Sequence, residues 1–188
     1  MRLTGAAIVL VSAAVLLNFS TFGPHEVSAQ VNSNDNRISL MDDCLPGDPG
    51  WTPTGGCDLK PHQGDVSNTE FGTFLTSTLI TGLVGHPSWR FEPSHLTINR
   101  GRTVHITNNG GRDHTLTQVA NFGGGAVAGL NIGMTRAPEC PAAPPLVTDV
   151  IPPGGSAELT GLAVTEPNQP HKFQCCFHPW MRATIRVQ

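Results

Sequence analysis

Apolar and polar residues alternate in short segments over the C-terminal half of the chain. Leu96 and Ile98 are separated by one polar residue, as are Val104 and Ile106. This two-residue period is typical of a half-buried β-strand. Further strands are indicated beside Leu116 and over residues 157–161, 172–175 and 183–187. About seven short strands with turn residues between them predict an all-β, antiparallel sandwich.

A helical period occurs once, ahead of these strands. Ser67 and Glu70 have the spacing of a capping box, in which the Ser hydroxyl accepts a hydrogen bond from the Glu backbone amide. Val66 and Phe71 occupy the two positions of a hydrophobic staple. The apolar face that follows consists of Phe71, Phe74, Leu75 and Leu79. The pattern predicts a helical segment within residues 65–86 that packs on the sandwich.

Three other segments show neither period. Residues 30–40 are polar and predict a loose linker. Residues 42–57 are rich in Pro and Gly, which excludes a regular helix or a central strand. Residues 119–150 are interrupted in the same way and predict a long loop, which is either functional or tied to the rest of the fold. We therefore assign residues 30–64 to a polar, acidic extension.

The N-terminus has the features of a secretory signal. Arg2 precedes an apolar run over residues 5–17, and Val27-Ser28-Ala29 offers a small-x-small cleavage site. The run is shorter than the roughly 20 residues that span a bilayer. Residues 1–29 are thus predicted to be a signal peptide, and the mature protein is expected to be secreted or periplasmic without stable membrane insertion.

Charge and composition exclude some classes of function. The 188 residues carry a formal net charge of −3, with 21 Gly and 16 Pro. Six Asp against Arg37 and Lys60 give residues 30–65 a balance of −4, whereas residues 66–188 have eight basic and seven acidic side chains, a balance of +1. No basic stripe is present, so a nucleic-acid partner is not expected. The chain also lacks nucleotide-binding and nucleophile-elbow motifs.

Five cysteines leave at least one thiol unpaired in an exported protein. Cys44 and Cys57 flank the Pro/Gly-rich segment, and a disulfide between them would contribute roughly 3 kcal/mol in the chain-entropy model. A second metal site with His62 lacks a fourth ligand. Cys140, Cys175 and Cys176 remain, and adjacent residues on a strand point to opposite faces. A Cys140–Cys176 pairing is one of several possibilities, and a vicinal Cys175–Cys176 disulfide is another.

Candidate metal-ligating residues are most concentrated near the C-terminus. Cys175, His178 and Met181 follow one another at Cys-x2-His-x2-Met spacing. Thiolate and thioether favour Cu(I), and imidazole suits both oxidation states of copper. Zinc is a weaker candidate because thioether is a poor zinc ligand. The set needs a second His, and His114 is the best candidate because it begins a strand after a Gly-Gly turn.

Three segments together resemble the cupredoxins, the type 1 blue copper proteins of the plastocyanin/azurin family. The C-terminal Cys/His/Met loop is similar to that of amicyanin. The other matching positions are Phe91, Pro93, Leu96, Ile98, Gly101, Thr103, Val104, Asn108 and His114, which Thr115 follows. The resemblance implies a Greek-key cupredoxin domain over residues 87–188. It also implies one type 1 copper ion held by His114, Cys175 and His178, with Met181 as a weak axial ligand, and it leaves Cys176 free to bridge Cys140.

By the same resemblance, the protein is expected to carry single electrons between protein redox partners such as a cytochrome or an oxidoreductase, as a monomer. A copper-binding module for storage, delivery or sensing, working with copper-trafficking proteins, is the second hypothesis. A structural domain without metal is a third, if Cys175 is in a disulfide. No His-x-His pair of a multicopper oxidase is present, so an enzyme is not expected. Thr115 stands where the family usually has Asn.

Overall fold

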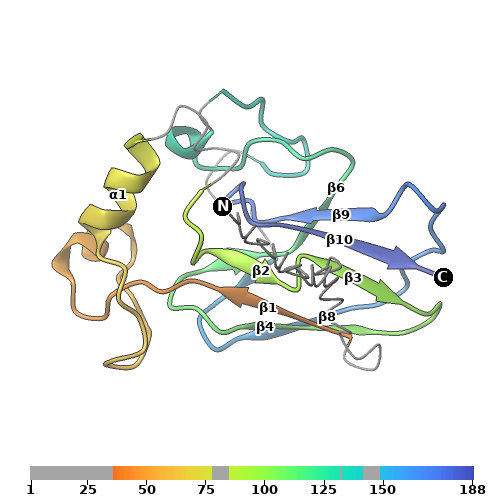
Figure 1. Ribbon diagram of the computed structural model, residues 1–188, viewed down its shortest axis with the longest axis horizontal. Coiled ribbons are helices and arrows are strands. Elements are labelled where there is room, and N and C mark those ends of the chain that lie inside the picture. Colours follow the sequence, from red (N-terminus) through yellow and green to blue (C-terminus); the bar gives the residue numbers. More distant parts are fainter. Residues whose placement is uncertain (1–35, 78–84, 132, 142–148) are drawn as a thin grey trace, which may run out of the picture. The chain divides into compact units, whose positions relative to one another are not determined.

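Two four-stranded sheets and one two-stranded pair make up the fold (Figure 1). The computed structural model describes residues 36–77, 85–131, 133–141 and 149–188. The signal peptide predicted over residues 1–29 lies outside this part of the chain. The first sheet has the order β2-β1-β4-β8 and the second β3-β10-β9-β6, while β5 pairs with β7. The strands are β1 Arg37–Met41, β2 Arg90–Glu92, β3 His95–Ile98, β4 Val104–Asn108, β5 His114–Thr115, β6 Thr117–Val119, β7 Val150–Ile151, β8 Ser156–Leu159, β9 His171–Gln174 and β10 Arg182–Val187.

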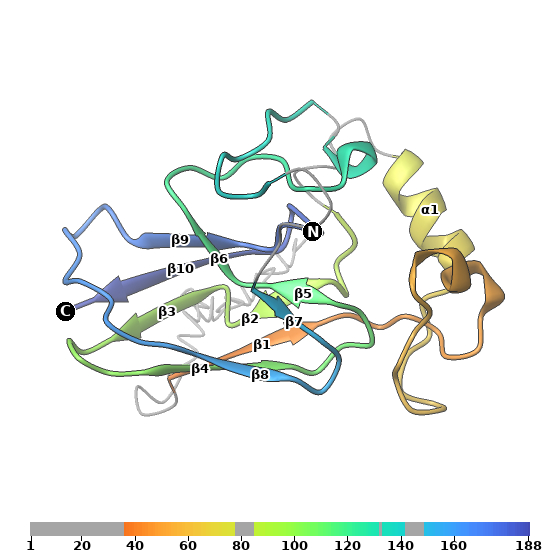
Figure 2. The same ribbon diagram turned by 180° about the vertical axis from the view of Figure 1, so that it is seen from behind.

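The two larger sheets share one apolar core, so the predicted β-sandwich is confirmed. Ile38 and Ile106 face the core from the first sheet, and Phe173 and Ile185 face it from the second. Figure 2 shows β1, β4 and β8 in one layer and β3, β9 and β10 in the other. Burying each such side chain stabilises the fold by about 1.5–3 kcal/mol.

The sheets are mixed, although the strand pattern predicted antiparallel pairing. β1 runs parallel to β4, with Ile38 opposite Ile106, and β10 runs parallel to β3, with Ile185 opposite Leu96. The other strand pairs are antiparallel. Both parallel pairs join segments that are distant in sequence, and hydropathy along the chain does not show which distant strands become neighbours.

The predicted linker over residues 30–40 is wrong from residue 37 onward. Residues 37–41 form β1, which lies between β2 and β4. Ile38 and Leu40 are buried, while Arg37 is exposed and Ser39 half-buried. This is a strand period of only five residues, and it follows a polar tract that conceals it. The sandwich therefore includes a strand from the extension that the sequence separated from it.

The predicted helix is present as α1, Asn68–Ser77. The Glu70 amide donates to the Ser67 hydroxyl at 3.0 Å, so the capping interaction is confirmed. A second cap comes from Asp48, whose carboxylate accepts from the Asn68 amide at 2.7 Å. Phe71 packs on Trp89 with ring centroids 4.5 Å apart. In the described part of the chain, no helix has the length and apolar character needed to cross a membrane.

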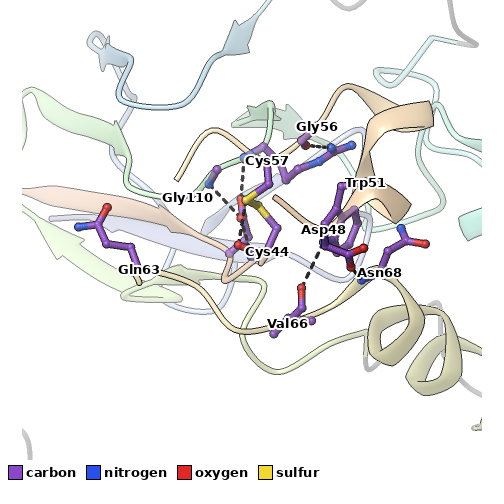
Figure 3. Close-up of a disulfide and its surroundings, with 12 residues drawn as sticks. Cys44, Asp48, Trp51, Gly56, Cys57, Gln63, Val66, Asn68 and Gly110 are labelled. Carbon is purple, nitrogen blue, oxygen red and sulfur yellow. Dashed lines mark hydrogen bonds between the residues drawn. A yellow bond between two sulfur atoms is a disulfide. The ribbon is translucent and has the colours of Figure 1, made fainter. Parts of the chain in front are cut away.

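Within the extension, the predicted disulfide between Cys44 and Cys57 is present and closes a local loop (Figure 3). Between the two cysteines lies the 3-10 helix η1, Pro49–Thr54. Its Trp51 is buried and donates its indole N–H to the Val66 carbonyl at 3.2 Å. The extension therefore packs against the domain and contributes Trp51 to its hydrophobic core.

The long loop after β6 is tied to the loop that follows β9. Cys140 forms a disulfide with Cys176, which confirms that pairing, and Cys175 is the unpaired cysteine. The Gln174 side chain accepts from the Gly123 amide at 3.0 Å, and the Ala126 amide donates to the Cys176 carbonyl at 2.6 Å. A short 3-10 helix, η2 (Ala128–Leu130), lies within this loop.

Candidate metal centre

The loop between β9 and β10 places Cys175 and His178 side by side. Cys175 follows the last residue of β9, and Met181 immediately precedes β10. The Cys175 amide donates to the Met181 carbonyl at 3.0 Å, and the Met181 amide donates to the His178 carbonyl at 2.9 Å. These two bonds fold the seven-residue loop back on itself, so His178 turns toward the Cys175 thiol.

His114 reaches the same place from a different strand pair. It is the first residue of β5 and pairs with Ile151 of β7. The turn before it is held by the buried Asn108, whose amide group donates to the carbonyls of Arg112 at 2.7 Å and Ile151 at 2.8 Å. The oxygen of that side chain accepts from the Gly110 amide at 2.9 Å. Asn108 therefore fixes both ends of the turn that delivers His114.

The three side chains form one compact, buried group. His114 Nδ1 lies 3.7 Å from Cys175 Sγ, His178 Nδ1 lies 3.6 Å from it, and the two nitrogens are 3.2 Å apart. His114 and Cys175 are fully buried, and His178 is 8% exposed. Among the described residues, His114, Cys175 and His178 are the side chains whose ligand atoms lie close enough together to hold a metal ion.

The spacing of the three donor atoms suits a trigonal metal site. Three ligands in one plane, with nitrogens about 2.0 Å and sulfur about 2.3 Å from the metal, require about 3.5 Å between nitrogens and about 3.7 Å between nitrogen and sulfur. The separations of 3.2, 3.6 and 3.7 Å lie close to these values. His114 and Cys175 are 61 positions apart in the sequence. The fold nevertheless brings their donor atoms to a separation that suits a shared metal ion.

Met181, the fourth predicted ligand, is buried at the end of the same loop, with 1% of its surface exposed. Its described hydrogen bonds are made by its backbone, to Cys175 and His178. Coordination through its thioether stays a prediction.

Thr115 links the two ligand segments. Its backbone amide points at Cys175 Sγ at 3.4 Å, and its hydroxyl accepts from the Cys176 amide at 2.8 Å. From the resemblance, an Asn would have been expected at this position. The threonine ties the segment of His114 to that of Cys175 through its own contacts.

Asp42 is a functional candidate that the sequence did not indicate. Its Oδ2 accepts a 2.7 Å hydrogen bond from His114 Nε2, and both side chains are fully buried. The carboxylate also accepts from the amides of Gly111 at 2.9 Å and Arg112 at 3.1 Å. A Cβ on Gly110 would lie 2.1 Å from Asp42 Oδ2, so the turn needs glycine there. Such carboxylate–histidine contacts fix the ring orientation of a ligand and raise its basicity.

The charges in this group follow from its contacts. Burial lowers the pKa of His114, but the hydrogen bond to Asp42 and the contact with Cys175 outweigh burial and raise it to about 9. Burial raises the pKa of Cys175, yet the neighbouring His114 and His178 bring it well below its usual value. Burial lowers the pKa of His178. These shifts favour a thiolate at Cys175 beside a protonated His114 in the metal-free site.

This protonation state predicts a pH-dependent metal affinity. Metal binding requires neutral imidazole and thiolate. Below about pH 9 the proton on His114 competes with the metal, whereas the lowered pKa of Cys175 weakens the competition by a proton at the sulfur. We expect the apparent affinity of the metal-free protein to rise about tenfold per pH unit between pH 6.5 and 8.5, one proton being released per metal. Chelator competition at several pH values measures this slope; a slope near zero contradicts the assignment.

Aromatic rings surround His178. Trp89 stands edge-on to its ring, with centroids 4.6 Å apart, and Trp180 lies at 5.7 Å. Phe177 lies at 6.3 Å. Phe177 and Trp180 flank His178 closely in sequence, whereas Trp89 is 89 positions from the histidine that it contacts, and no local signal indicated it.

The sequence matches no protein-family model and no curated protein. Among solved structures, a purple cupredoxin from Nitrosopumilus maritimus is similar at 19% identity, over 55% of this chain and 86% of the other, with a TM-score of 0.38. A reduced amicyanin mutant is similar at 21% identity, over 53% and 73% of the two chains, with a TM-score of 0.35. A second amicyanin mutant, in the Cu(I) form, gives 19% identity, the same coverage and a TM-score of 0.35.

The described residues form a β-sandwich of two four-stranded sheets around one apolar core. It carries one buried His-Cys-His group, His114, Cys175 and His178, at the end of the sandwich where β9 leads into β10.

Proposed function

We propose that this protein is an exported type 1 copper protein that carries single electrons between redox proteins. One copper ion is held by His114, Cys175 and His178, with Met181 as a weak axial ligand. The main support for this proposal is the buried triangle of two imidazole nitrogens and one cysteine sulfur, which are 3.2 to 3.7 Å apart. Two imidazoles, one thiolate and a weak thioether are the donor set of copper electron-transfer sites.

Bound copper supplies the chemistry, since it accepts and returns one electron by changing between Cu(II) and Cu(I). The chain supplies a fixed set of donors. Thr115 links the two ligand segments, Asp42 orients His114, and the Cys140–Cys176 disulfide anchors the residue next to Cys175. Because these constraints do not depend on the charge of the ion, the site needs little rearrangement when an electron arrives.

The burial of the site favours electron transfer over copper delivery. His114 and Cys175 are inaccessible to solvent, and the edge of His178 is the most exposed part of the group. A chelating partner must reach the ion to remove it, whereas an electron needs only a short path through His178. The proposed partners are therefore redox proteins such as a cytochrome or an oxidoreductase, met in the periplasm or outside the cell by a monomer that is not itself an enzyme.

The visible absorption and electron paramagnetic resonance spectra of the copper-loaded protein test this proposal. An intense thiolate-to-copper absorption band with narrow hyperfine splitting, together with a reversible one-electron potential, is the expected result. A colourless complex would overturn the proposal. Ready loss of copper to a chelator with slow electron exchange would support storage or delivery instead.

Replacing the axial candidate should change the potential and not the occupancy. Met181→Gln keeps a donor atom at the same position but exchanges a soft thioether for a harder amide oxygen. We expect the copper to stay bound and the reduction potential to fall, because the oxygen stabilises Cu(II) relative to Cu(I). Voltammetry of both proteins measures the difference. Complete loss of copper would show that Met181 does more than occupy an axial position.

A further inference from the structure

The turn that leads to His114 lies directly against the disulfide of the extension. A Cβ added to Gly111 would be 2.6 Å from Cys44 Sγ and 2.9 Å from Cys57 Sγ, so the two sulfurs occupy the space of a side chain. The φ of Gly111 is not positive, so this contact, and not the backbone conformation, requires glycine there. Figure 3 shows Gly110, the preceding residue of the turn, beside the same disulfide. The disulfide therefore touches a backbone segment that ends at a proposed metal ligand.

Residues 42–58, which we call the clamp, also hold the turn by hydrogen bonds. The Gly111 amide donates to Asp42 Oδ1 at 2.9 Å, and the Gly111 carbonyl accepts from the Asp58 amide at 3.0 Å. The Arg112 amide donates to Asp42 Oδ2 at 3.1 Å. The Arg112 guanidinium donates to two backbone carbonyls of the loop between the two cysteines. The clamp thus contacts both residues of the turn through backbone and side-chain atoms.

The disulfide joins the two sides of the clamp. Asp42 lies just before Cys44, and Asp58 directly follows Cys57. The first side continues β1, and the backbone on either side of Cys44 is hydrogen-bonded to Val66 at 2.7 and 2.8 Å. The second side is linked to the first by the disulfide, across a loop that contains the short helix η1. Opening this bond would therefore weaken the hold of the Asp58 side on the turn.

We propose that the Cys44–Cys57 disulfide positions His114 for metal binding without contacting the ion. Asn108 holds the turn from the sandwich, and the disulfide keeps the clamp closed on the same turn. A ligand that is held in place before binding loses less conformational freedom when the ion arrives, so the clamp raises the metal affinity of the site. This role rests on the proposed function, because it concerns the same ligand.

Hydrogen exchange of the metal-free, full-length protein tests the clamp itself. The double variant Cys44→Ala/Cys57→Ala removes both sulfurs and creates no new thiol that could bind copper. We expect the exchange protection of the Gly111 and Arg112 amides to fall about tenfold more than that of the two amides that close the loop between β9 and β10, because the opening is local. Equal losses of protection at all four amides would mean general destabilisation and would overturn the proposal.

Competition for copper(I) with the chelator bicinchoninate tests the link to the ligand. The affinity of the double variant should fall about 10- to 100-fold, the range found for groups that orient a ligand histidine. Val187→Ala is the control, because Val187 is buried in the core at the end of β10 that is remote from Met181. It lowers the stability without touching the clamp, and its affinity should not change. An unchanged affinity in the double variant, or an equal loss in Val187→Ala, contradicts the positioning role.

A second variant decides the question if the double variant does not fold. Gly111→Ala leaves the disulfide intact but places a methyl group against both sulfurs, so it should displace the turn and lower the copper affinity. Gly72→Ala is the matched control, since a Cβ at this position of α1 has no atom within 4 Å. Equal affinities of the two alanine variants would show that the contact between the turn and the disulfide does not matter.

This inference and the proposed function can fail separately. Gly111 and Arg112 amides that lose protection in a protein without a thiolate–copper band would keep the clamp and remove the copper function. A coloured protein whose exchange and affinity do not change in the double variant would keep the copper function and remove this inference.

Discussion

Replacing Cys175 by Ser will remove the intense visible band of the copper-loaded protein and weaken copper binding by at least about 100-fold, because a thiolate becomes a neutral hydroxyl. Cys175 is the free cysteine, and its sulfur lies within 3.7 Å of both imidazole nitrogens. A hydroxyl at this position neither donates charge to the ion nor produces the thiolate-to-copper transition. Absorption and chelator competition on the same sample measure both effects.

Cys176→Ser is the matched variant, since it alters the neighbouring residue by the same single atom. It breaks the disulfide to Cys140 and should cost about 2–5 kcal/mol of stability. The colour should persist below the lowered unfolding temperature. The opposite pattern, with Cys176→Ser colourless and Cys175→Ser coloured, would reverse the ligand assignment.

Removal of the Asp42 carboxylate will affect both the stability and the metal affinity. Asp42→Ala leaves His114 Nε2 and the amides of Gly111 and Arg112 without their acceptor. Loss of one partner from a buried charged pair costs about 3–5 kcal/mol. Loss of the carboxylate behind a ligand histidine lowers metal affinity about 10- to 100-fold. Urea unfolding of the metal-free protein and chelator competition measure the two effects.

Asp42→Asn separates charge from shape. The amide keeps an acceptor for His114, so the fold should lose less than in Asp42→Ala. The charge that raises the pKa of His114 disappears, and the rise of metal affinity with pH should therefore end at a lower pH. Asp43→Asn is the control, because Asp43 is adjacent and only half-buried. Affinity unchanged in Asp42→Asn and Asp42→Ala would mean that Asp42 does not act through His114.

The parts of the site that lie close together in sequence were predictable, and the parts that lie far apart were not. Cys175, His178 and Met181 occupy seven consecutive positions, so their spacing alone indicated soft donors at one loop. His114 was found because a Gly-Gly turn and a strand start are local signals. Asp42 gave no such signal: it lies 72 positions from His114, and its role depends on β1 entering the sheet.

The fold divides in the same way. Strands with a clear two-residue period, such as β4 and β10, were predicted at their observed places. β1 was hidden because its five residues adjoin a polar tract, and the parallel pairing of β1 with β4 depends on contacts across the whole domain. A cavity of about 440 Å³ beside His178 could not be predicted, because its wall is assembled from residues far apart in sequence, such as Trp51, Trp89 and Phe177.

The disulfide at Cys176 has a consequence for how the protein matures. If the chain is exported as proposed, Cys140 can react with either of two adjacent thiols, and the bond to Cys176 is the one that leaves Cys175 free for the proposed copper ion. Once that bond has formed and Cys175 is buried, later oxidants cannot reach the remaining thiol. A chain that pairs Cys140 with Cys175 would lack the thiolate that the proposed copper site needs, so the oxidation step would set the fraction of molecules able to bind copper until thiol–disulfide exchange corrects the pairing.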